Sequence, residues 1–404
     1  MARAVADHEP SARAERPRSE AGACAAAIRQ EWDIAVVGAG PAGAAAARGL
    51  AQAGCRVVLV ERSDFAGPRV GESLAPGVQP LLRELGVWAQ FLALQPLPSH
   101  GTRSLWGGPE IQEHSHLITP WGCGWHVDRG AFDRMLAEAA HAAGAQLLCR
   151  TTFHGCHRAG EDWELELECH NEDDSTRRRF WIRAKLMIDA TGRVARLARW
   201  AGAKRLLFDR LVGIATEFHG IDVAHAGYVM VEAARYGWWY TAPIPGDRMV
   251  AMLMTDSDLS RGEGLAAEAG WYASLRDTTA TWGRLAGGAP AWGPRLFAAV
   301  SQRLCRNGPS PQWLAVGDAA LAVDPITGSG VVRALRSAKA AVPVVLALLA
   351  NETPLTIDAH ERERDLECTA YLQERAWYYG MEQRWRNAAF WRRRASEPMV
   401  GSEM

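Results

Sequence analysis

The residues with the clearest chemical meaning are three glycines, Gly38, Gly40 and Gly43, which follow directly after an apolar strand at Ile34 to Val37. In this spacing the first glycine allows a tight turn, the second leaves room for a pyrophosphate, and the third lets a helix pack against the sheet. The helix N-terminus then faces the phosphates with unpaired N–H groups. Glu61 follows a second apolar strand, where a carboxylate can accept hydrogen bonds from ribose hydroxyls. The pattern predicts a bound dinucleotide.

A second group of residues with chemical potential lies far along the chain. An apolar strand ends at Gly317-Asp318, and Asp324-Pro325 with Gly328-Ser329-Gly330 then opens a long helix. A carboxylate at a strand end can hold a polyol hydroxyl, and the helix N-terminus can stabilise negative charge on a reduced ring system. Taken alone, an aspartate that caps a helix in an ordinary turn explains this segment equally well.

Regular elements must position these two groups. The sequence predicts a helix over Val78 to Leu85 and another from an Asp128 cap to Gly144. Alternating apolar residues predict strands at Trp163 to Cys169 and Arg179 to Ala184, around a turn at Asn171 to Asp174. Leu186 to Gly192 is a further strand that ends at a glycine.

These elements predict an α/β fold: a Rossmann-type dinucleotide-binding domain with a mixed-sheet substrate domain and a helical C-terminal segment. The organisation we expect is a flexible N-terminal arm at 1–30, dinucleotide-binding parts at 31–110, 126–205 and 305–352, substrate-domain parts at 111–125 and 206–304, and a helical C-terminal segment at 353–404.

Composition limits the partners. The net charge of −1 favours neither a nucleic-acid partner nor an acidic membrane surface, and the longest apolar run, Ala340 to Ala350, is too short to span a bilayer. The 8 cysteines are scattered without metal-binding spacing, which fits a reducing, cytoplasmic location and no metal site. His114 and His116 are interpreted as surface residues.

Taken together, the motifs resemble those of FAD-dependent monooxygenases of the p-hydroxybenzoate hydroxylase fold. Gly71-Glu72-Ser73 and the stretch Gly237 to Pro243 make the chain similar to the branch that contains the flavin-dependent halogenases. The resemblance covers residues 31 to about 394. It implies that FAD is held by the following residues: Gly38, Gly40, Ala42, Gly43, Glu61 and Arg62 on the ADP half, Arg129 along the cofactor, Asp318 on the ribityl chain, and Pro325 and Gly328 to Gly330 facing the isoalloxazine.

Departures from the halogenase pattern are informative. Halogenases carry a GWxWxIP signature, whereas Tyr240 and Ala242 stand in this chain at the second tryptophan and the isoleucine. Halogenase chemistry also relies on a lysine after the GES-type loop, and no lysine occurs before Lys185. Arg103 is a poor substitute because its guanidinium stays protonated. The chain resembles more closely the flavoproteins that hydroxylate a tryptophan of a separate polypeptide during cysteine tryptophylquinone formation.

The resemblance implies hydroxylation of an electron-rich aromatic ring through a flavin C4a-hydroperoxide, on a small molecule or on a tryptophan of a partner polypeptide. We expect Glu72, Ser73 and Tyr240 to supply catalytic groups near the ring. Tryptophans at 106, 121, 125, 238 and 239 could form a dry wall, with Trp106, Trp238 and Trp239 in the substrate pocket. NAD(P)H or a separate flavin reductase would supply electrons.

Other interpretations stay open. The chain could be an FADH2-dependent halogenase, a flavin-dependent reductase or dehydrogenase of a small molecule, or a flavin-bearing binding protein. A nicotinamide dehydrogenase is also compatible with Glu61, which suits either dinucleotide. The C-terminal stretch, with Trp377, Met381 and Trp385 at helical spacing, is interpreted as a packed amphipathic helix rather than a single-stranded nucleic-acid site.

Overall fold

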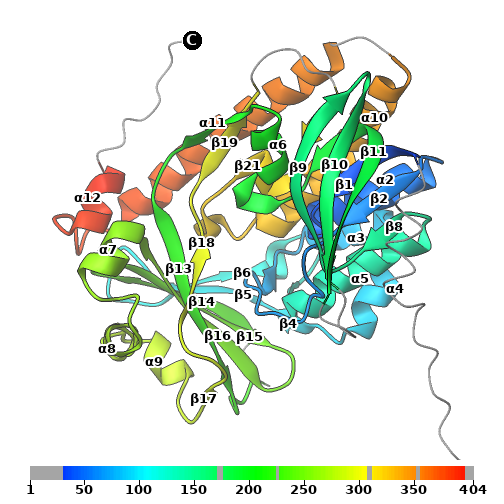
Figure 1. Ribbon diagram of the computed structural model, residues 1–404. Helices are drawn as coiled ribbons and strands as arrows, with labels where there is room; N and C mark the ends of the chain where they lie inside the picture. Colours follow the sequence, from blue (N-terminus) through cyan, green and yellow to red (C-terminus); the bar gives the residue numbers. More distant parts are fainter. Residues whose placement is uncertain (1–30, 171–175, 224–226, 307–311, 352–354, 396–404) are drawn as a thin grey trace, which may run out of the picture.

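A computed structural model describes residues 31–170, 176–223, 227–306, 312–351 and 355–395. The expected N-terminal arm at 1–30 and the expected turn at 171–174 lie outside the described residues. The described chain has a sheet covered by helices, beside which a second large sheet and the C-terminal helices are placed (Figure 1). The expected fold class is confirmed.

The first sheet has the strand order β8-β2-β1-β11-β10-β9, with β20 also paired to β11. Its strands are β1 (Glu31–Val37), β2 (Val57–Val60), β8 (Gln146–Leu148), β9 (Thr151–Ala159), β10 (Asp162–His170), β11 (Arg177–Asp189) and β20 (Trp313–Ala315). Strands β8, β2, β1, β11 and β20 pair in parallel, whereas β9 and β10 form the antiparallel meander expected from the sequence. The parallel part is a Rossmann-type arrangement, in which ligands bind at the carboxyl ends of the strands.

Helices α2 (Pro41–Gln52), α5 (Arg129–Ala142) and α10 (Gly330–Leu349) pack on this sheet. The first turn of α5 is capped as the sequence predicts, because the Asp128 carboxylate accepts a hydrogen bond of 2.9 Å from the backbone N–H of Ala131. The alanine-rich α2 is buried along most of its length, which lets it approach both the sheet and α10 closely. Small residues in α2 therefore bring the first motif next to the helix that follows the second.

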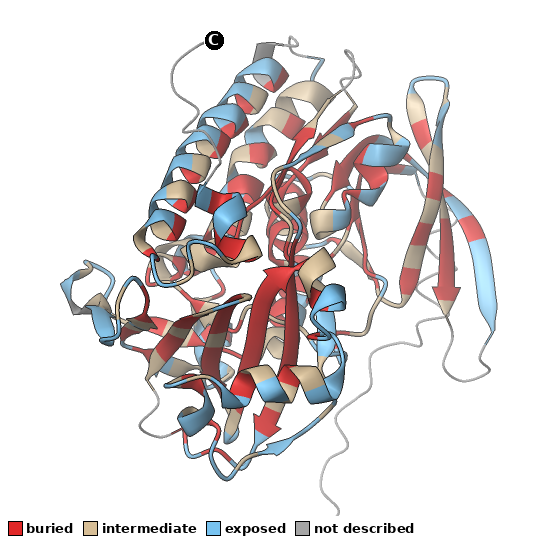
Figure 2. Ribbon diagram, turned by 90° about the vertical axis from the view of Figure 1, so that its left-hand side faces the viewer, coloured by how far each residue is buried: buried red, intermediate tan, exposed pale blue. Residues whose placement is uncertain are grey.

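The second large sheet has the order β17-β13-β16-β15-β14-β5-β6, with β18 also paired to β13. Its strands are β5 (Gly101–Leu105), β6 (Gln112–Ser115), β13 (Leu211–His219), β14 (Tyr228–Ala234), β15 (Gly237–Ile244), β16 (Arg248–Asp256), β17 (Ala289–Pro290) and β18 (Arg295–Ala298). Because β5 pairs with β14, this sheet begins at Gly101, before the boundary at 111 that the sequence suggested. The centre of the sheet is buried, as the red strands in Figure 2 show.

Two small sheets join the large ones. One has the order β3-β7-β4 and the other β12-β19-β21. Their strands are β3 (Ser73–Leu74), β4 (Leu97–Ser99), β7 (Gly124–His126), β12 (Lys204–Leu207), β19 (Gln302–Cys305) and β21 (Leu321–Ala322). Strand β4 continues into β5 after His100, so the β3-β7-β4 sheet leads from the Gly71-Glu72-Ser73 loop to the second large sheet.

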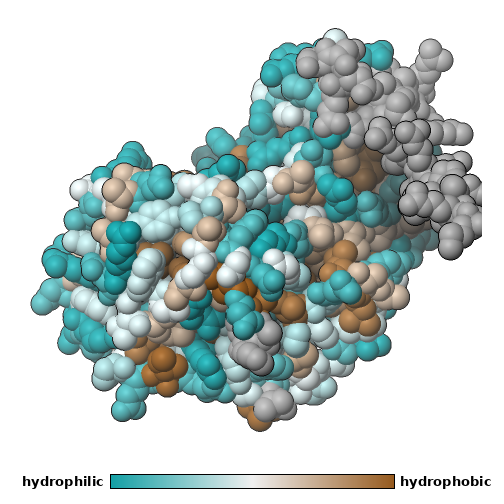
Figure 3. Space-filling view, turned by 90° about the horizontal axis from the view of Figure 1, so that it is seen from below, coloured by the Kyte–Doolittle hydropathy of each residue, from teal (hydrophilic) through white to brown (hydrophobic). Residues whose placement is uncertain are grey.

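The remaining helices cover the sheets. They are α3 (Val78–Glu84), α4 (Trp88–Ala93), α6 (Arg196–Trp200), α7 (Ser257–Gly262), α8 (Glu268–Arg276), α9 (Thr281–Arg284), α11 (Leu355–Met381) and α12 (Ala389–Ala395), with short 3-10 turns η1 (His116–Ile118), η2 (Gly192–Val194), η3 (Gly317–Ala319) and η4 (Pro325–Thr327). Within the described ranges, none of the helices combines the length and apolar character that a bilayer crossing requires. The face of the molecule drawn in Figure 3 is mostly hydrophilic, with small hydrophobic groups between polar ones.

The C-terminal segment differs from the single amphipathic helix that the sequence suggested. Helix α11 ends at Met381 and α12 begins only at Ala389, so Trp385 lies between them. Trp377 is 63% exposed, whereas Trp391 is buried. The expectation that Trp377, Met381 and Trp385 share one packed helical face is therefore wrong, because the chain turns after Met381 and packs α12 instead.

Candidate active site

The glycine loop between β1 and α2 has the geometry that the sequence predicts. Gly38 has a φ of +105°, and a Cβ atom there would lie 2.2 Å from the Ala190 carbonyl oxygen. A Cβ atom on Gly43 would lie 1.8 Å from the Gly38 carbonyl oxygen. A Cβ atom on Gly40 would meet no described atom within 4 Å. The first and third glycines are therefore required by the fold, and the second borders open space at the start of α2.

Glu61 lies at the end of β2 beside this loop. Its carboxylate accepts hydrogen bonds from the Ala39 N–H at 2.9 Å and from the Ser63 hydroxyl at 2.5 Å. The Arg69 guanidinium is 3.4 Å from the same carboxylate. Arg62, the next residue after Glu61, is exposed. The acid thus stands at the edge of the glycine loop, in the position that suits contact with a ribose.

The second motif meets the first in space. Gly317 has a φ of +58°, and a Cβ atom there would lie 2.7 Å from the Cβ of Ala42 in α2. The Gly317 N–H donates to the Ser337 hydroxyl of α10 at 3.0 Å. Asp318 is partly exposed and its carboxylate is 3.3 Å from Arg193 Nε. Two segments far apart in the sequence therefore border one region, as expected for a single extended cofactor.

The loop before α10 is open at its glycines and anchored at its aspartate. Cβ atoms on Gly328 and Gly330 would meet no described atom within 4 Å, and Gly328 has a φ of +59°. Asp324 precedes Pro325 and is fully buried. Its carboxylate accepts hydrogen bonds from the Ile326 N–H at 3.0 Å and from the Tyr379 hydroxyl at 2.7 Å. Burial raises the pKa of Asp324.

We expect Tyr379→Phe to destabilise the protein by about 1–3 kcal/mol, because it removes a partner of the buried Asp324 and the acceptor of the Trp238 indole N–H, which is 3.0 Å away. Unfolding in urea, followed by circular dichroism, measures this loss. The neighbouring change Tyr378→Phe is the control, and it should cost less than about 0.5 kcal/mol because Tyr378 is only partly buried. Equal stability of the two variants would contradict the role of Tyr379.

Arg129 supports the Gly71-Glu72-Ser73 loop. Its Nη1 donates to the carbonyl oxygens of Val70 at 2.8 Å and Gly71 at 3.1 Å, and its guanidinium is 3.2 Å from Asp133. Gly71 has a φ of +97°, and a Cβ atom there would lie 2.5 Å from Arg129 Nη1. The structure thus places Arg129 against this loop at the start of α5.

Glu72 is the most unusual residue of the loop. It is 1% exposed, and no side chain of the described residues hydrogen-bonds to its carboxyl group. Burial raises its pKa from 4.5 to about 7, although the nearby Arg129 acts in the opposite direction. An acid with such a pKa can take up and release a proton near neutral pH.

Tyr240 and Ser73 lie beside Glu72. The Tyr240 hydroxyl hydrogen-bonds to Ser73, and burial together with the Glu72 charge raises the pKa of Tyr240 well above its ordinary value. Ser73 Oγ is also 3.4 Å from Nδ1 of His126, which is fully buried. Burial lowers the pKa of His126 to about 3, so its imidazole is neutral at neutral pH. The structure therefore brings together the three residues that the sequence suggested as catalytic and adds His126.

The tryptophans do not form the single wall that the sequence suggested. Trp106 and Trp238 contact each other at a centroid distance of 6.4 Å, in a cluster with Tyr379 and Trp391. Trp239 belongs to a different core cluster, and its ring packs against Trp271 at 4.9 Å, because neighbouring strand residues point to opposite faces. Trp125 packs against Trp88 and Phe91, and Trp121 is 47% exposed.

His114 is exposed on β6, and His116 Nδ1 is 3.1 Å from the Ser99 carbonyl oxygen. Among the described residues, no cluster of three or more histidine, cysteine, aspartate or glutamate side chains could hold a metal ion. The two histidines thus share no such cluster within the ranges that the structure covers.

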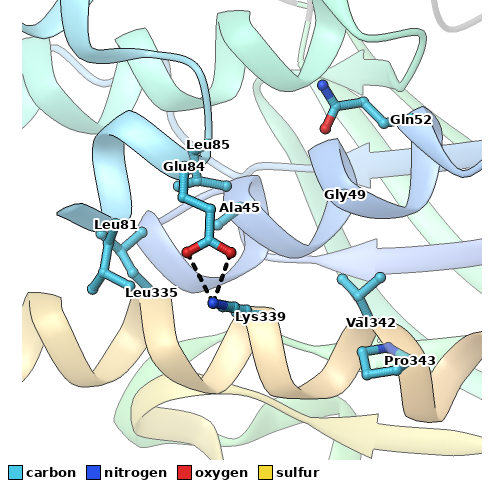
Figure 4. A pocket seen from close by; sticks show the side chains of 10 residues that line it. All are labelled: Ala45, Gly49, Gln52, Leu81, Glu84, Leu85, Leu335, Lys339, Val342 and Pro343. Atoms are coloured by element: carbon cyan, nitrogen blue, oxygen red, sulfur yellow. Dashed lines mark hydrogen bonds and ion pairs between the residues drawn. The ribbon is translucent and has the colours of Figure 1, made fainter.

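A cleft of about 200 Å³ lies elsewhere, between α2, α3 and α10 (Figure 4). Its walls are mostly apolar, and Lys339 and Glu84 form an exposed ion pair of 2.7 Å across it. The cleft contains neither the glycine loop nor Glu72. It lies on the helical side of the first sheet and is not part of the site described above.

Comparisons with known proteins agree with this geometry. Residues 33–210 match the FAD dependent oxidoreductase family. LodB of Marinomonas mediterranea, assigned as an FAD-dependent oxidoreductase, is 27% identical over 90% of this chain and 97% of its own length. The converging glycine motifs, the acid beside them and these matches indicate an enzyme similar to FAD-dependent oxidoreductases.

Solved structures resemble the chain as a whole. The myxobacterial chondrochloren halogenase CndH, a variant of FAD-dependent halogenases, has a TM-score of 0.79 at 24% identity. The match covers 90% of this chain and 86% of the CndH chain. The peptidyl tryptophan dihydroxylase QhpG, which is essential for tryptophylquinone cofactor biogenesis, has a TM-score of 0.72 at 25% identity. The match covers 92% of this chain and 80% of the QhpG chain. The fold is thus that of halogenase-like flavoenzymes.

Sequence reasoning found the cofactor motifs but not the residues that reach the site from other elements. His126, Tyr379 and Arg284, which is described below, were missed. Their sequence neighbourhoods carry no recognisable motif. Only the three-dimensional arrangement places His126 beside Ser73 and Tyr379 beside Asp324.

Proposed function

We propose that the chain is an FAD-dependent monooxygenase that hydroxylates an electron-rich aromatic ring, namely a tryptophan side chain of a partner polypeptide during biogenesis of a quinone cofactor. The likeness to QhpG over 92% of the chain supports this substrate class. LodB matches this chain over 97% of its own length, at 27% identity.

The observation that favours hydroxylation over halogenation is that no lysine follows the Gly71-Glu72-Ser73 loop where halogenases have one. No lysine stands before Lys185 in the sequence, and Arg103 lies on β5 with its side chain 45% exposed. Arg103 pairs with Glu113 at 3.0 Å and stacks over Tyr228. A permanently charged, paired guanidinium on this strand is a poor replacement for an amine that handles a hypohalous acid.

The flavin, when bound and reduced, supplies the activation of O2. Overall, one oxygen atom enters the ring and the other leaves as water, with two electrons and two protons consumed. We assign to Glu72 the uptake and release of the proton that the ring loses. Tyr240, which its raised pKa keeps protonated, would act as a hydrogen-bond donor, and Ser73 would fix the position of its hydroxyl. Trp106 and Trp238 would exclude water from the same region.

FAD would be held by the glycine loop, Glu61, Asp318 and the turn from Pro325 to Gly330. The open space at Gly40, Gly328 and Gly330 fits a pyrophosphate and a flat ring system. Electrons would come from NAD(P)H that binds transiently or from a separate flavin reductase, because the sequence has one dinucleotide motif.

Mass spectrometry tests the proposal. FAD-loaded protein, a reductant and air are incubated with a candidate partner polypeptide, and we expect its intact mass to rise by about 16 Da for each oxygen inserted. Fragmentation should place the gain on a tryptophan. A partner that is unchanged with oxygen, but modified when bromide is added, would contradict hydroxylation.

Halogenation is the second candidate. The TM-score of 0.79 to CndH favours it at the level of the fold. In the experiment above it predicts a mass gain that depends on the halide supplied. The bromide arm therefore separates the two candidates directly.

A further inference from the structure

Buried polar atoms without partners occur in and beside the β3-β7-β4 sheet. Among the described residues, His126 Nε2 and Ser99 Oγ have no hydrogen-bond partner, and both residues are 0% exposed. The Nε atom of Arg284 is also buried and unpaired within the described part of the chain. Because native proteins rarely bury polar atoms unpaired, such a group calls for a specific reason.

Strand pairing places two of these side chains on one face. His126 stands opposite both Ser73 and Leu97 in the β3-β7-β4 sheet. Ser99 lies two residues after Leu97 on β4, so its side chain points to the same face as those of Leu97 and His126. Ser73, His126 and Ser99 therefore border the same side of this small sheet.

Arg284 approaches these residues from the end of α9. Its Nη2 donates to the Tyr228 carbonyl oxygen at 2.8 Å, and its charge interacts with both His126 and Tyr240. Burial and the nearby Arg103 charge lower the pKa of Arg284 to about 10. It therefore remains protonated at neutral pH, close to the proposed catalytic tyrosine.

No carboxylate among the described residues pairs with Arg284, whereas the nearby Arg103 on β5 pairs with Glu113. Buried charges in proteins are normally compensated by an opposite charge. A guanidinium also offers parallel N–H groups that match a carboxylate in two hydrogen bonds. The surroundings of Arg284 thus favour a bound carboxylate.

We propose that Arg284, together with His126 and Ser99, binds a carboxylate that the aromatic substrate carries beside its ring. The inference rests on the proposed function and makes it more specific, because it selects acidic aromatic substrates. The carboxylate has two sources: a free aromatic acid, or an acidic side chain next to a tryptophan in a polypeptide. Both present the same group to Arg284.

Calorimetric titration of the full-length, FAD-loaded protein tests the inference without turnover. The probes are indole-3-propionate and indole-3-propionamide, and a peptide pair in which aspartate or asparagine precedes tryptophan. We expect the wild-type protein to bind the acid of at least one pair about tenfold more tightly than its amide. A preference within the indole pair alone indicates a free acid, and one within the peptide pair indicates a polypeptide.

Variants assign the preference to Arg284. Arg284→Gln should reduce it to less than about twofold, and Arg284→Lys should keep part of it because the charge remains. Arg103→Gln is the matched control, because it removes a nearby positive charge that already has an acidic partner, and it should leave the preference intact. Thermal unfolding confirms that each variant is folded. If Arg284→Gln does not fold, a reduced preference in Arg284→Lys still tests the role of Arg284.

Three outcomes would overturn the inference: equal binding of acid and amide in both pairs, an unchanged preference in Arg284→Gln, or binding of acetate as tight as that of indole-3-propionate, which would mean a site for small anions only. Failure of the proposed function looks different. In that case the carboxylate preference persists, but no oxygen enters any aromatic substrate in the mass experiment.

Discussion

Replacing Glu72 with glutamine is expected to make the protein without cofactor more stable at about pH 8, by about 3 kcal/mol, and to change its stability by less than about 0.5 kcal/mol at about pH 4.5. The carboxyl group has a pKa of about 7 in the folded protein and an ordinary value of 4.5. Below the lower value both states are protonated, so the residue has no effect. As the pH rises, the unfolded state ionises first, which destabilises the folded state until the pKa of about 7 is passed.

Glutamine has nearly the same shape and never ionises, so Glu72→Gln escapes this destabilisation. Urea unfolding at the two pH values measures the difference. Glu113→Gln is the control, because the Tyr228 hydroxyl and Arg103 lower the pKa of Glu113, and this variant should gain no stability at the higher pH. If Glu72→Gln and the wild type are equally stable at both pH values, the Glu72 carboxyl is solvated rather than buried.

The same substitution should reduce turnover by about a hundredfold or more if Glu72 moves a proton, as proposed. A variant that is more stable and less active would identify Glu72 as a residue whose folding cost is tolerated for function. Stability and activity are measured on the same sample, so a simple folding defect cannot produce this combination.

How far the sequence could predict the structure depends on whether a feature is local. The positions of Gly38, Gly40 and Gly43 follow from strand, turn and helix signals that are close together, and the structure confirms the tight turn at Gly38 and the close packing at Gly43. The Asp128 cap is equally local and is confirmed by its hydrogen bond to Ala131. The joining of this loop to Gly317 was predicted only because a family resemblance connected the two motifs.

Contacts between distant elements could not be predicted. The hydrogen bond from Tyr379 to Asp324 and the contact of Ser73 with His126 join residues more than fifty positions apart. Nothing in either residue's own neighbourhood indicates its partner, because such pairs are set by how the C-terminal helices and the small sheet pack. For the same reason the sequence does not identify Arg284, because only the fold shows that no carboxylate of the described residues pairs with it.

Strand alternation separates Trp239 from Trp238. Trp238 and Trp239 are neighbours in a strand, so their side chains must point to opposite faces. The expectation that both line one pocket does not satisfy this alternation, and the structure places Trp239 against Trp271. The alternation rule alone would have left Trp238 and Tyr240 together on one face, which is the face with Ile326.

The cofactor loop gives the other large effect that we expect. Gly43→Ala should destabilise the protein by about 3 kcal/mol or more and abolish FAD binding, because its Cβ would lie 1.8 Å from the Gly38 carbonyl oxygen and 2.8 Å from the Ala190 Cβ. Both neighbours directly follow strands β1 and β11, and their N–H groups hydrogen-bond to the carbonyl oxygens of Val60 and Val37, so neither can move away without disturbing the sheet. Thermal unfolding and titration with FAD measure the two losses.

Gly40→Ala is the matched variant that separates folding from binding. Its φ of −68° suits alanine, and no described atom lies within 4 Å of the new Cβ, so stability should stay within about 0.5 kcal/mol of the wild type. The added methyl group would nevertheless occupy the place where a pyrophosphate approaches the backbone, and FAD affinity should fall by about tenfold or more. Unchanged FAD affinity in Gly40→Ala would mean that the phosphates do not lie over this glycine, and the assignment of the loop to the cofactor would fail.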